Sequence, residues 1–437
     1  MPRYLSIFYF STELNNSDSH GMLNHRLNGN MLFLLIVLIA VLGLLLYFLM
    51  ELQRSNNLQY KNWTFSTDLS RDLASAALLY SRSPDLISDI EIPIYGSSET
   101  HIRSIKFQHG LHDILKITGR KGNRKDSVCF SIGWAPDTSF TTFYMANHFR
   151  PLVLVGNSEI EGKVKVPMGY VQKGNIKGVF HYANIPDQNE TDTSQNTLPF
   201  WHEYVDRIER YYTKLDSGLL TSEKFPEQDA PIVNSFGNPT DYYSSNDELH
   251  IRHLLSGNIV IYSSDTIFLQ KDAELSGPVL SAPNVVIEQG FRGAVQIIAS
   301  NSITIEQNVR LDYPSELVLH NSDTGKILID SNFSISGNII CYDTSSTLDF
   351  FDKKKISIMK NATVKGILKI DGKATFKENI NIFGLCHLEG AEFPSGINTF
   401  ENHLYDFNVK NIDTAQIGIL HTIPFGHSRT EFMEWLD

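Results

Sequence analysis

The chain has 437 residues, 42% of them hydrophobic, which is enough for two or three domain cores. Its formal net charge of -12 argues against a nucleic-acid partner, because a phosphate backbone is bound by clustered Lys and Arg. The cysteines Cys129, Cys341 and Cys386 are too few for a disulfide framework and form no C-x-x-C zinc pair. We interpret them as small buried hydrophobic residues and expect no cofactor.

An uncharged segment of twenty residues, Met31 to Met50, reads "MLFLLIVLIAVLGLLLYFLM". About 20 apolar residues are needed to cross a bilayer, so a single-pass span in the inner (cytoplasmic) membrane is expected. A cleaved secretory signal is the alternative, but its apolar run is shorter and ends at a small-x-small site, which "ELQRSNN" does not supply. The lipid bilayer is therefore an expected partner. Basic residues lie on both sides of the span, so the positive-inside rule does not set the orientation.

The apolar run is expected to continue as one helix over residues 31–83, because residues 30–83 contain no proline. Apolar residues then recur at steps of mostly three to five, an amphipathic stripe that predicts packing on the soluble part. The stripe consists of Leu58, Trp63, Phe65, Leu69, Leu73, Ala76, Ala77 and Tyr80.

This outline, carried by "HRLNGNMLFLLIVLIAVLG", resembles the pilin and pseudopilin plan of a short leader, a glycine and a long helix half in the membrane. The resemblance makes residues 1–30 a leader and implies cleavage between Gly29 and Asn30. It also implies that the C-terminal part lies outside the cytoplasm. Most such proteins have Glu at the position that Leu34 occupies here. Some minor pseudopilins and minor pilins also lack this Glu. An ordinary single-pass anchor with a short cytoplasmic tail is the alternative.

Residues 84–150 contain the short β-rich runs "IRSIKFQ", "HDILKITG", "SVCFSIGW" and "FTTFYMA", separated by turn residues. They predict an antiparallel meander. The basic loop Gly119 to Asp126 is interpreted as a solvated hairpin tip, with contact to anionic lipid or glycan as the alternative.

A nine-residue pattern recurs from Ile267, Val285 and Ile303, at a step of eighteen, and then from Ile327, Ile356 and Leu368, with an early copy at Leu152. It reads apolar, any, apolar, two free positions, a turn former, two free positions, apolar. The sixth position tolerates a left-handed backbone in six of the seven copies, which predicts a repeated corner. Those positions are Asn157, Asp272, Gly290, Asn308, Asn332 and Asn361, with Lys373 in the copy from Leu368.

Strands that meet at a repeated corner and stack at a fixed step describe a single-stranded β-helix. The fold class is therefore mainly β, with a long N-terminal helix. The loosening of the step to 24 and 29 favours a right-handed coil with corner loops, as in bactofilin-like proteins. First coils are expected at 151–185 and the main stack at 249–405, with a C-terminal cap or tail at 406–437.

Residues 186–248 are predicted as an insertion of polar linker, helix and loop. The helix is "PFWHEYVDRIERYYTKLDSGLL", from Pro199 to Leu220, with Gly218 near its end. Its apolar face is expected to pack against its own domain, although a face for a partner is the alternative. That face consists of Phe200, Tyr204, Ile208, Tyr211, Tyr212, Leu215 and Leu219.

The segments "LVLVGNSEIEGKVKVP", "IEQGFRGAVQIIAS", "LDYPSEL" and "FENHL" resemble an uncharacterised group of bacterial envelope proteins with an N-terminal anchor and β-helical repeats. The resemblance covers most of residues 30–405. It implies an architecture and a cellular location and carries no activity.

A polar ladder of Gln270, Glu288, Glu306 and Asp330 is expected at equivalent positions of successive coils. It could bind a cation or sugar, but outward polar positions of a β-helix look the same. No catalytic motif is present, since "WHEYVD" lacks the His pair of a zincin and no Gly-x-Ser-x-Gly occurs.

Two functions remain from the sequence. One is a structural or assembly protein of the cell envelope, a minor subunit of a pilus-like or secretion machine with other envelope subunits as partners. The alternative is a membrane-tethered protein that binds or cleaves polysaccharide, which would make a glycan the partner.

Overall fold

The computed structural model divides the chain into two compact units, Met1–Ser66 and Thr67–Asp437. Residues 1–28 of the leader predicted at 1–30 lie outside the described residues, as do parts of several loops. The described residues are 29–82, 92–93, 100–135, 140–186, 191–216, 223–226, 230–320, 325–342, 354–411 and 429–436.

A single helix, α1 (Gly29–Arg82), forms the first unit and continues into the second. It is the one helix, among the described residues, that is long and apolar enough to cross a membrane by length and composition. All side chains from Met31 to Trp63 are exposed, so no other described residue covers the apolar run. The predicted span from Met31 to Met50 lies inside this helix, which makes it a candidate membrane span.

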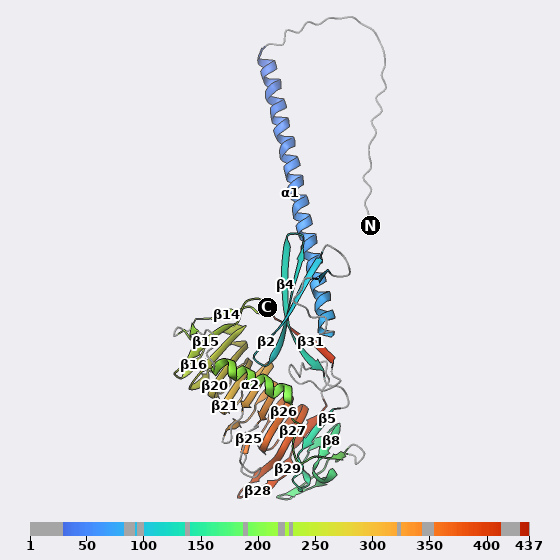
Figure 1. Ribbon diagram of the computed structural model, residues 1–437, viewed down its shortest axis with the longest axis vertical. Coiled ribbons are helices and arrows are strands. Elements are labelled where there is room, and N and C mark those ends of the chain that lie inside the picture. The colour runs from blue at the N-terminus through green and yellow to red at the C-terminus, as the bar shows by residue number, and fades with distance from the viewer. Residues whose placement is uncertain are drawn as a thin grey trace. The chain divides into compact units, whose positions relative to one another are not determined.

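An antiparallel sheet follows the helix, with strand order β1-β2-β3-β4-β31 (Figure 1). The hairpin of β3 and β4 turns at Gly122, which has a φ of 57°, so the basic segment is a hairpin tip as predicted. The last strand is a correction, because the C-terminal segment pairs with β4 instead of ending as a tail. The strands are β1 (Ile92–Pro93), β2 (Thr100–His109), β3 (His112–Lys121), β4 (Arg124–Ala135) and β31 (Arg429–Leu436).

The second half of α1 covers one face of this sheet and forms a hydrophobic core with it. The helix contributes Leu69, Leu73, Ala76, Ala77 and Tyr80, and the sheet contributes Ile102, Leu115, Ile117, Phe130 and Ile132. The predicted stripe is therefore shorter than expected. Its first members, Leu58 and Trp63, are 54% and 65% exposed, because the core begins only at Leu69.

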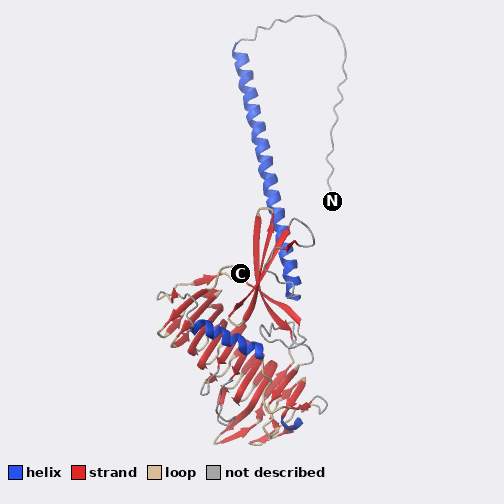
Figure 2. Ribbon diagram, viewed as in Figure 1, coloured by secondary structure: helices blue, strands red, loops and turns tan. Residues whose placement is uncertain are grey.

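The rest of the chain is a parallel β-solenoid of about 11 turns, which confirms the predicted β-helix (Figure 2). A full coil pairs along three stretches, as β20 does with β17, β18 and β19 in turn. In the main stack the strands are β13 (Glu223–Lys224), β14 (Ile232–Asn234), β15 (Asp241–Ser245), β16 (Leu249–Ile251), β17 (Leu255–Gly257), β18 (Ile259–Ser263), β19 (Thr266–Leu269), β20 (Leu275–Ile287), β21 (Arg292–Ile305), β22 (Arg310–His320), β23 (Lys326–Ile329), β24 (Ser334–Tyr342), β25 (Lys354–Ile358), β26 (Ala362–Phe376), β27 (Ile380–Ser395), β28 (Asn398–Glu401), β29 (His403–Tyr405) and β30 (Phe407–Lys410).

Successive coils place equivalent apolar residues in register, so the interior is a set of aliphatic ladders. One ladder runs through Ile267, Val285, Ile303, Ile327 and Ile356, and each of these side chains is at most 2% exposed. Alternate residues of each strand point inward, so the first, third, seventh and ninth positions of the nine-residue pattern become the core, while the fifth lies at the exposed turn.

A ladder of asparagines occupies one corner of the stack. Asn308, Asn332, Asn361 and Asn379 all have φ of 60–61°, the left-handed region that Asn tolerates. The side-chain amides of Asn332, Asn361 and Asn379 each donate to the side-chain oxygen of the asparagine in the preceding coil, with N···O distances of 3.0, 3.0 and 2.8 Å. At this corner, neighbouring coils are thus joined by side-chain hydrogen bonds as well as by backbone hydrogen bonds. Gly290, with a φ of 81°, fills the same position one coil before Asn308.

Three predicted corners are corrected. Ile356 pairs with Ala374 and not with Leu368, because the pattern of the last copy begins six residues later, and this makes Asn379 the corner instead of Lys373. Asp272 has no left-handed backbone, since its turn is closed by a hydrogen bond from Ala273 N–H to Gln270 O at 3.0 Å. For Asn157 the left-handed residue is the preceding Gly156, φ 66°, which adopts it without a Cβ clash.

The early strands do not begin the stack but extend its far end. β5 (Thr141–Met145) pairs with β27 and with β8 (Lys163–Val166), and β8 pairs with β12 (Thr191–Thr193). The segment "FTTFYMA" was expected in the meander and is therefore solenoid, and residues 407–410, expected in a cap, pair with β7 inside the stack. The other early elements are β6 (Leu152–Val155), β7 (Glu159–Ile160), the short helix η3 (Pro167–Gly169), β9 (Val171–Lys173), β10 (Asn175–Ile176) and β11 (Val179–Phe180).

Helix α2 (His202–Asp216) connects this far end to the beginning of the main stack (Figure 2). Its Tyr204 and Ile208, two of the residues predicted on the packed face, are buried against one outer face of the solenoid, together with Val205 and with Trp201, which precedes the helix. The face consists of Val260, Val279, Ile298, Val318, Ile340, Ile367 and Leu385, one from each of seven strands. Phe200, also predicted on the packed face, is 49% exposed, and Trp201 packs there instead.

The register of the interior ladder can be tested at two neighbouring residues. Ile305 is 1% exposed between Ile287 and Ile329, whereas Thr304 lies half-buried on the outer side of the same strand. We expect Ile305→Asp to lower the free energy of unfolding by several kcal/mol, because it buries a carboxylate without a partner. Thr304→Asp should lower it by less than about 1 kcal/mol. Urea unfolding of both variants measures the difference, and equal losses would contradict this register.

Candidate functional site

A row of buried polar side chains lies on the outer surface of the solenoid, where the β2–β3 turn meets it. Gln296, Glu316 and Asn338 occupy equivalent positions of three successive coils and are 1%, 1% and 2% exposed. They point outward because their neighbours Ile297, Leu317 and Ile339 fill the interior. Polar side chains this deeply buried are rare unless something satisfies them.

The turn of the β2–β3 hairpin satisfies Gln296. The side-chain oxygen of Gln296 accepts from Leu111 N–H at 2.8 Å, and its amide nitrogen contacts the carbonyl of His109 at 3.3 Å. A Cβ on Gly110, which has a φ of 56°, would lie 2.4 Å from that side-chain oxygen. Glycine is therefore required for the turn to approach this closely.

His112 and Glu316 form the buried centre of the row. Asn338 donates to Glu316 Oε1 at 2.7 Å, and His112 Nε2 lies 3.5 Å from the same oxygen. The Gln296 amide nitrogen lies 3.1 Å from His112 Nδ1, so Nδ1 accepts and Nε2 carries the proton of the neutral ring. Glu316 Oε2 has no hydrogen-bond partner among the described residues.

Burial keeps all of these groups uncharged near neutral pH. Desolvation raises the pKa of Glu316 to about 8, against the hydrogen bond from Asn338, which lowers it. Desolvation lowers the pKa of His112 to about 3 and that of His109 to about 4. The 3.5 Å contact of His112 and Glu316 is thus between a neutral imidazole and a protonated carboxyl, and no ion pair forms there.

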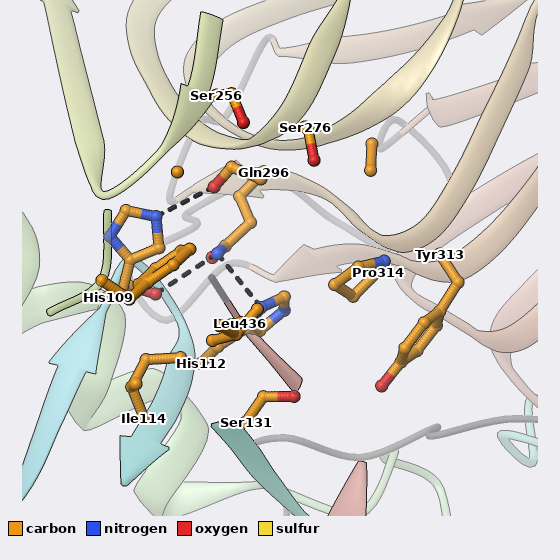
Figure 3. A pocket seen from close by; sticks show the side chains of 14 residues that line it. His109, His112, Ile114, Ser131, Ser256, Ser276, Gln296, Tyr313, Pro314 and Leu436 are labelled. Carbon is orange, nitrogen blue, oxygen red and sulfur yellow. Dashed lines mark hydrogen bonds between the residues drawn. The ribbon is translucent and has the colours of Figure 1, made fainter. Parts of the chain in front are cut away.

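A cavity of about 280 Å³ opens beside this row (Figure 3). Three small outward residues of successive coils, Ser256, Ser276 and Ala294, line its solenoid side. The lining is completed by the sheet residues His109, His112, Ile114, Ser131 and Leu436 and by the solenoid residues Phe236, Gly257, Gly277, Gln296, Tyr313 and Pro314.

The cavity offers hydrogen bonds and aromatic surface but no charge. None of its described lining residues is Asp, Glu, Lys or Arg, so they do not supply the carboxylate pair of a glycosidase. Within the described ranges, no group of three or more His, Cys, Asp or Glu side chains is arranged to hold a metal ion. The arrangement can bind a neutral polar molecule.

The predicted polar ladder lies elsewhere and supports the solenoid turns. Glu306 Oε2 accepts from Gln289 N–H at 2.9 Å, and Glu288 Oε2 is 3.4 Å from Lys271 N, each one coil back. Asp330 accepts from Ser331 N–H at 2.6 Å, which lowers the pKa of its carboxyl. Gln270 takes part through its backbone, with its N–H donating to Ile251 O at 3.0 Å. These carboxylates cap turn amides.

The other residues singled out in the sequence also lie outside the cavity. Gly29 and Asn30 begin α1, and Met31 and Met50 are exposed on it. All three cysteines are free and buried, as expected. The sequence did not identify His109, His112, Gln296 or Glu316, whose contacts join residues about two hundred positions apart. One signal was present for Gln296, since "VQIIA" is a nearly continuous apolar run, typical of a strand covered on both faces.

Comparisons with protein-family models, with curated proteins and with solved structures found no match to this chain. The site is therefore interpreted from its own residues.

The protonated state of Glu316 predicts a pH dependence of stability. Between pH 4.5 and about 8 the unfolded chain loses the proton of this carboxyl while the folded chain retains it. The free energy of unfolding should then fall with rising pH, by about 1.4 kcal/mol per pH unit for one proton. Glu316→Gln cannot ionise and keeps the acceptor for Asn338, so the slope should disappear.

Urea unfolding between pH 6.5 and 8 is the measurement, because His112 and His109, whose pKa values are lowered, contribute to the slope mainly below pH 6.5. Glu306→Gln, at an exposed position of the same solenoid, is the control and should keep the wild-type slope. An unchanged slope in Glu316→Gln would show that this carboxyl is ionised in the folded chain.

Proposed function

We propose that the chain is a membrane-anchored structural subunit of a bacterial cell-envelope assembly, akin to a minor subunit of a pilus-like or secretion machine. The observation that carries the proposal is the division of α1. Its second half is buried against the antiparallel sheet from Leu69 to Tyr80, and its first part from Met31 to Trp63 is exposed among the residues that the structure describes. This is the plan of the pilin-like resemblance, a helix shared between a membrane and a folded head.

The helix also carries apolar side chains beyond the length that a bilayer needs. Leu52, Leu58, Tyr60 and Trp63 are 54–67% exposed, and they follow the twenty residues that span a hydrocarbon core. Exposed apolar surface of this kind marks an interaction site. Helices of neighbouring subunits would cover it, which makes other envelope subunits the expected partners.

The position of the solenoid in the chain supports a display role. The solenoid is inserted between β4 and β31, two neighbouring strands of the sheet. The helix and sheet thus form one structural module, and both ends of the solenoid segment are connected to this module. In this proposal the span lies in the inner membrane and the solenoid lies outside the cytoplasm.

The membrane location is tested by fractionation. The full-length chain should stay with membranes after a carbonate wash, because its span is long enough to remain in the hydrocarbon core. A fragment that begins at Thr67 keeps the helix residues that cover the sheet and should be soluble. Protease added to spheroplasts should remove the solenoid of the full-length chain. Full-length protein in the soluble fraction, or a solenoid protected from protease, would contradict the location.

The assembly role is tested at the N-terminus. If the chain enters a pilus-like assembly, a prepilin-type peptidase cuts between Gly29 and Asn30, which frees the helix to leave the bilayer. Mass spectrometry of the purified protein should then give an N-terminus at Asn30, and Gly29→Leu should abolish the cleavage. Leu34→Glu is the control and should still be cleaved. An intact leader in the wild-type chain would leave an ordinary anchor and exclude the pilus-like role.

A further inference from the structure

One polar atom that lines the cavity between sheet and solenoid is left without a protein partner. Ser131 Oγ belongs to a side chain that is 1% exposed, and it has no hydrogen bond within the described part of the chain. Buried polar atoms are usually satisfied, so a buried hydroxyl left open beside a cavity is suited to a ligand that supplies the partner.

The chemistry of the lining narrows the class of ligand. Hydroxyl groups of Ser131, Ser256 and Ser276 offer donors and acceptors (Figure 3). Phe236 also lines the cavity and offers an aromatic surface. A sugar ring has the complementary form, with hydroxyl groups around its rim and apolar C–H faces. Because no described lining residue is charged, a charged sugar would lose its hydration without gaining an opposite charge.

We propose that this cavity binds one ring of a neutral saccharide. Its volume of about 280 Å³ is at the lower end of small-molecule sites, which suits a single ring better than a longer chain. The ring would contact Ser131 of the sheet and Ser256 and Ser276 of the solenoid. The proposal rests on the cavity alone and stands independently of the anchoring role.

The test uses the full-length chain in lauryldimethylamine oxide micelles, since this detergent has no sugar headgroup. Glucose, galactose and mannose, each beside its uronate, are titrated and followed by saturation-transfer NMR. At least one neutral sugar should bind saturably with a Kd of roughly 1–10 mM, the weak affinity expected of one ring. Its uronate should bind at least about tenfold more weakly. Absence of saturation by every neutral sugar up to about 50 mM, or equal binding of the uronates, would overturn the proposal.

Two matched substitutions place the binding in the cavity. Ser276→Phe fills the cavity and should weaken binding by at least about tenfold. Ser336→Phe adds the same ring to the same face three coils away, outside the lining, and should leave binding unchanged. Equal affinities of the two variants would exclude this cavity as the site.

Ser131→Ala separates a binding role from a structural one. Its hydroxyl is buried without a protein partner, so its removal should leave the Tm unchanged or raise it. Affinity for the neutral sugar should nevertheless fall by about three- to tenfold, because the ligand loses a hydrogen bond. Unchanged affinity would overturn the role of Ser131 and with it the observation on which the proposal rests.

Discussion

The hydrogen bonds between parallel coils hold each residue of the solenoid directly over its equivalent in the next coil, and most of the molecule's second unit depends on that register. Stacked in this way, Ile267, Val285 and Ile303 form a continuous interior, and the asparagines of one corner form a chain of hydrogen bonds between their side-chain amides. The same constraint acts on the outer surface. There it aligns Gln296, Glu316 and Asn338 into a row that no single coil would produce.

A stack of coils leaves an open strand at each end, which invites pairing with other chains. In this protein the early strands occupy the far end, with β5 paired to β27 and β8 paired to β5, although they precede the main stack in the chain. Helix α2 then covers the outer face over many coils. Its Arg207 makes two 2.8 Å hydrogen bonds to Asp113, the second residue of β3. The helix is thereby held to the solenoid by apolar contact and to the sheet by charge.

The sequence predicted the parts of the fold that repeat locally. The nine-residue pattern predicted the inward residues from Ile267 to Ile356, because alternation within one strand reports its own burial. It misplaced the copy at Leu368, since that strand also alternates and only pairing with the previous coil separates it from Ala374. The site was not predictable in this way. Nothing in the local sequence of Glu316 shows that a turn two hundred residues earlier, at His112, comes to cover it.

The covering of that row explains both the neutrality of the site and the presence of a cavity. The turn from His109 to His112 reaches the solenoid only because Gly110 lacks a side chain, and its approach removes water from Glu316. Beside the turn, Ser256 and Ser276 are too small to fill the space that remains, so a cavity persists where sheet and solenoid meet. Because opposite walls of the cavity belong to the sheet and the solenoid, a molecule bound there contacts both of them at the same time.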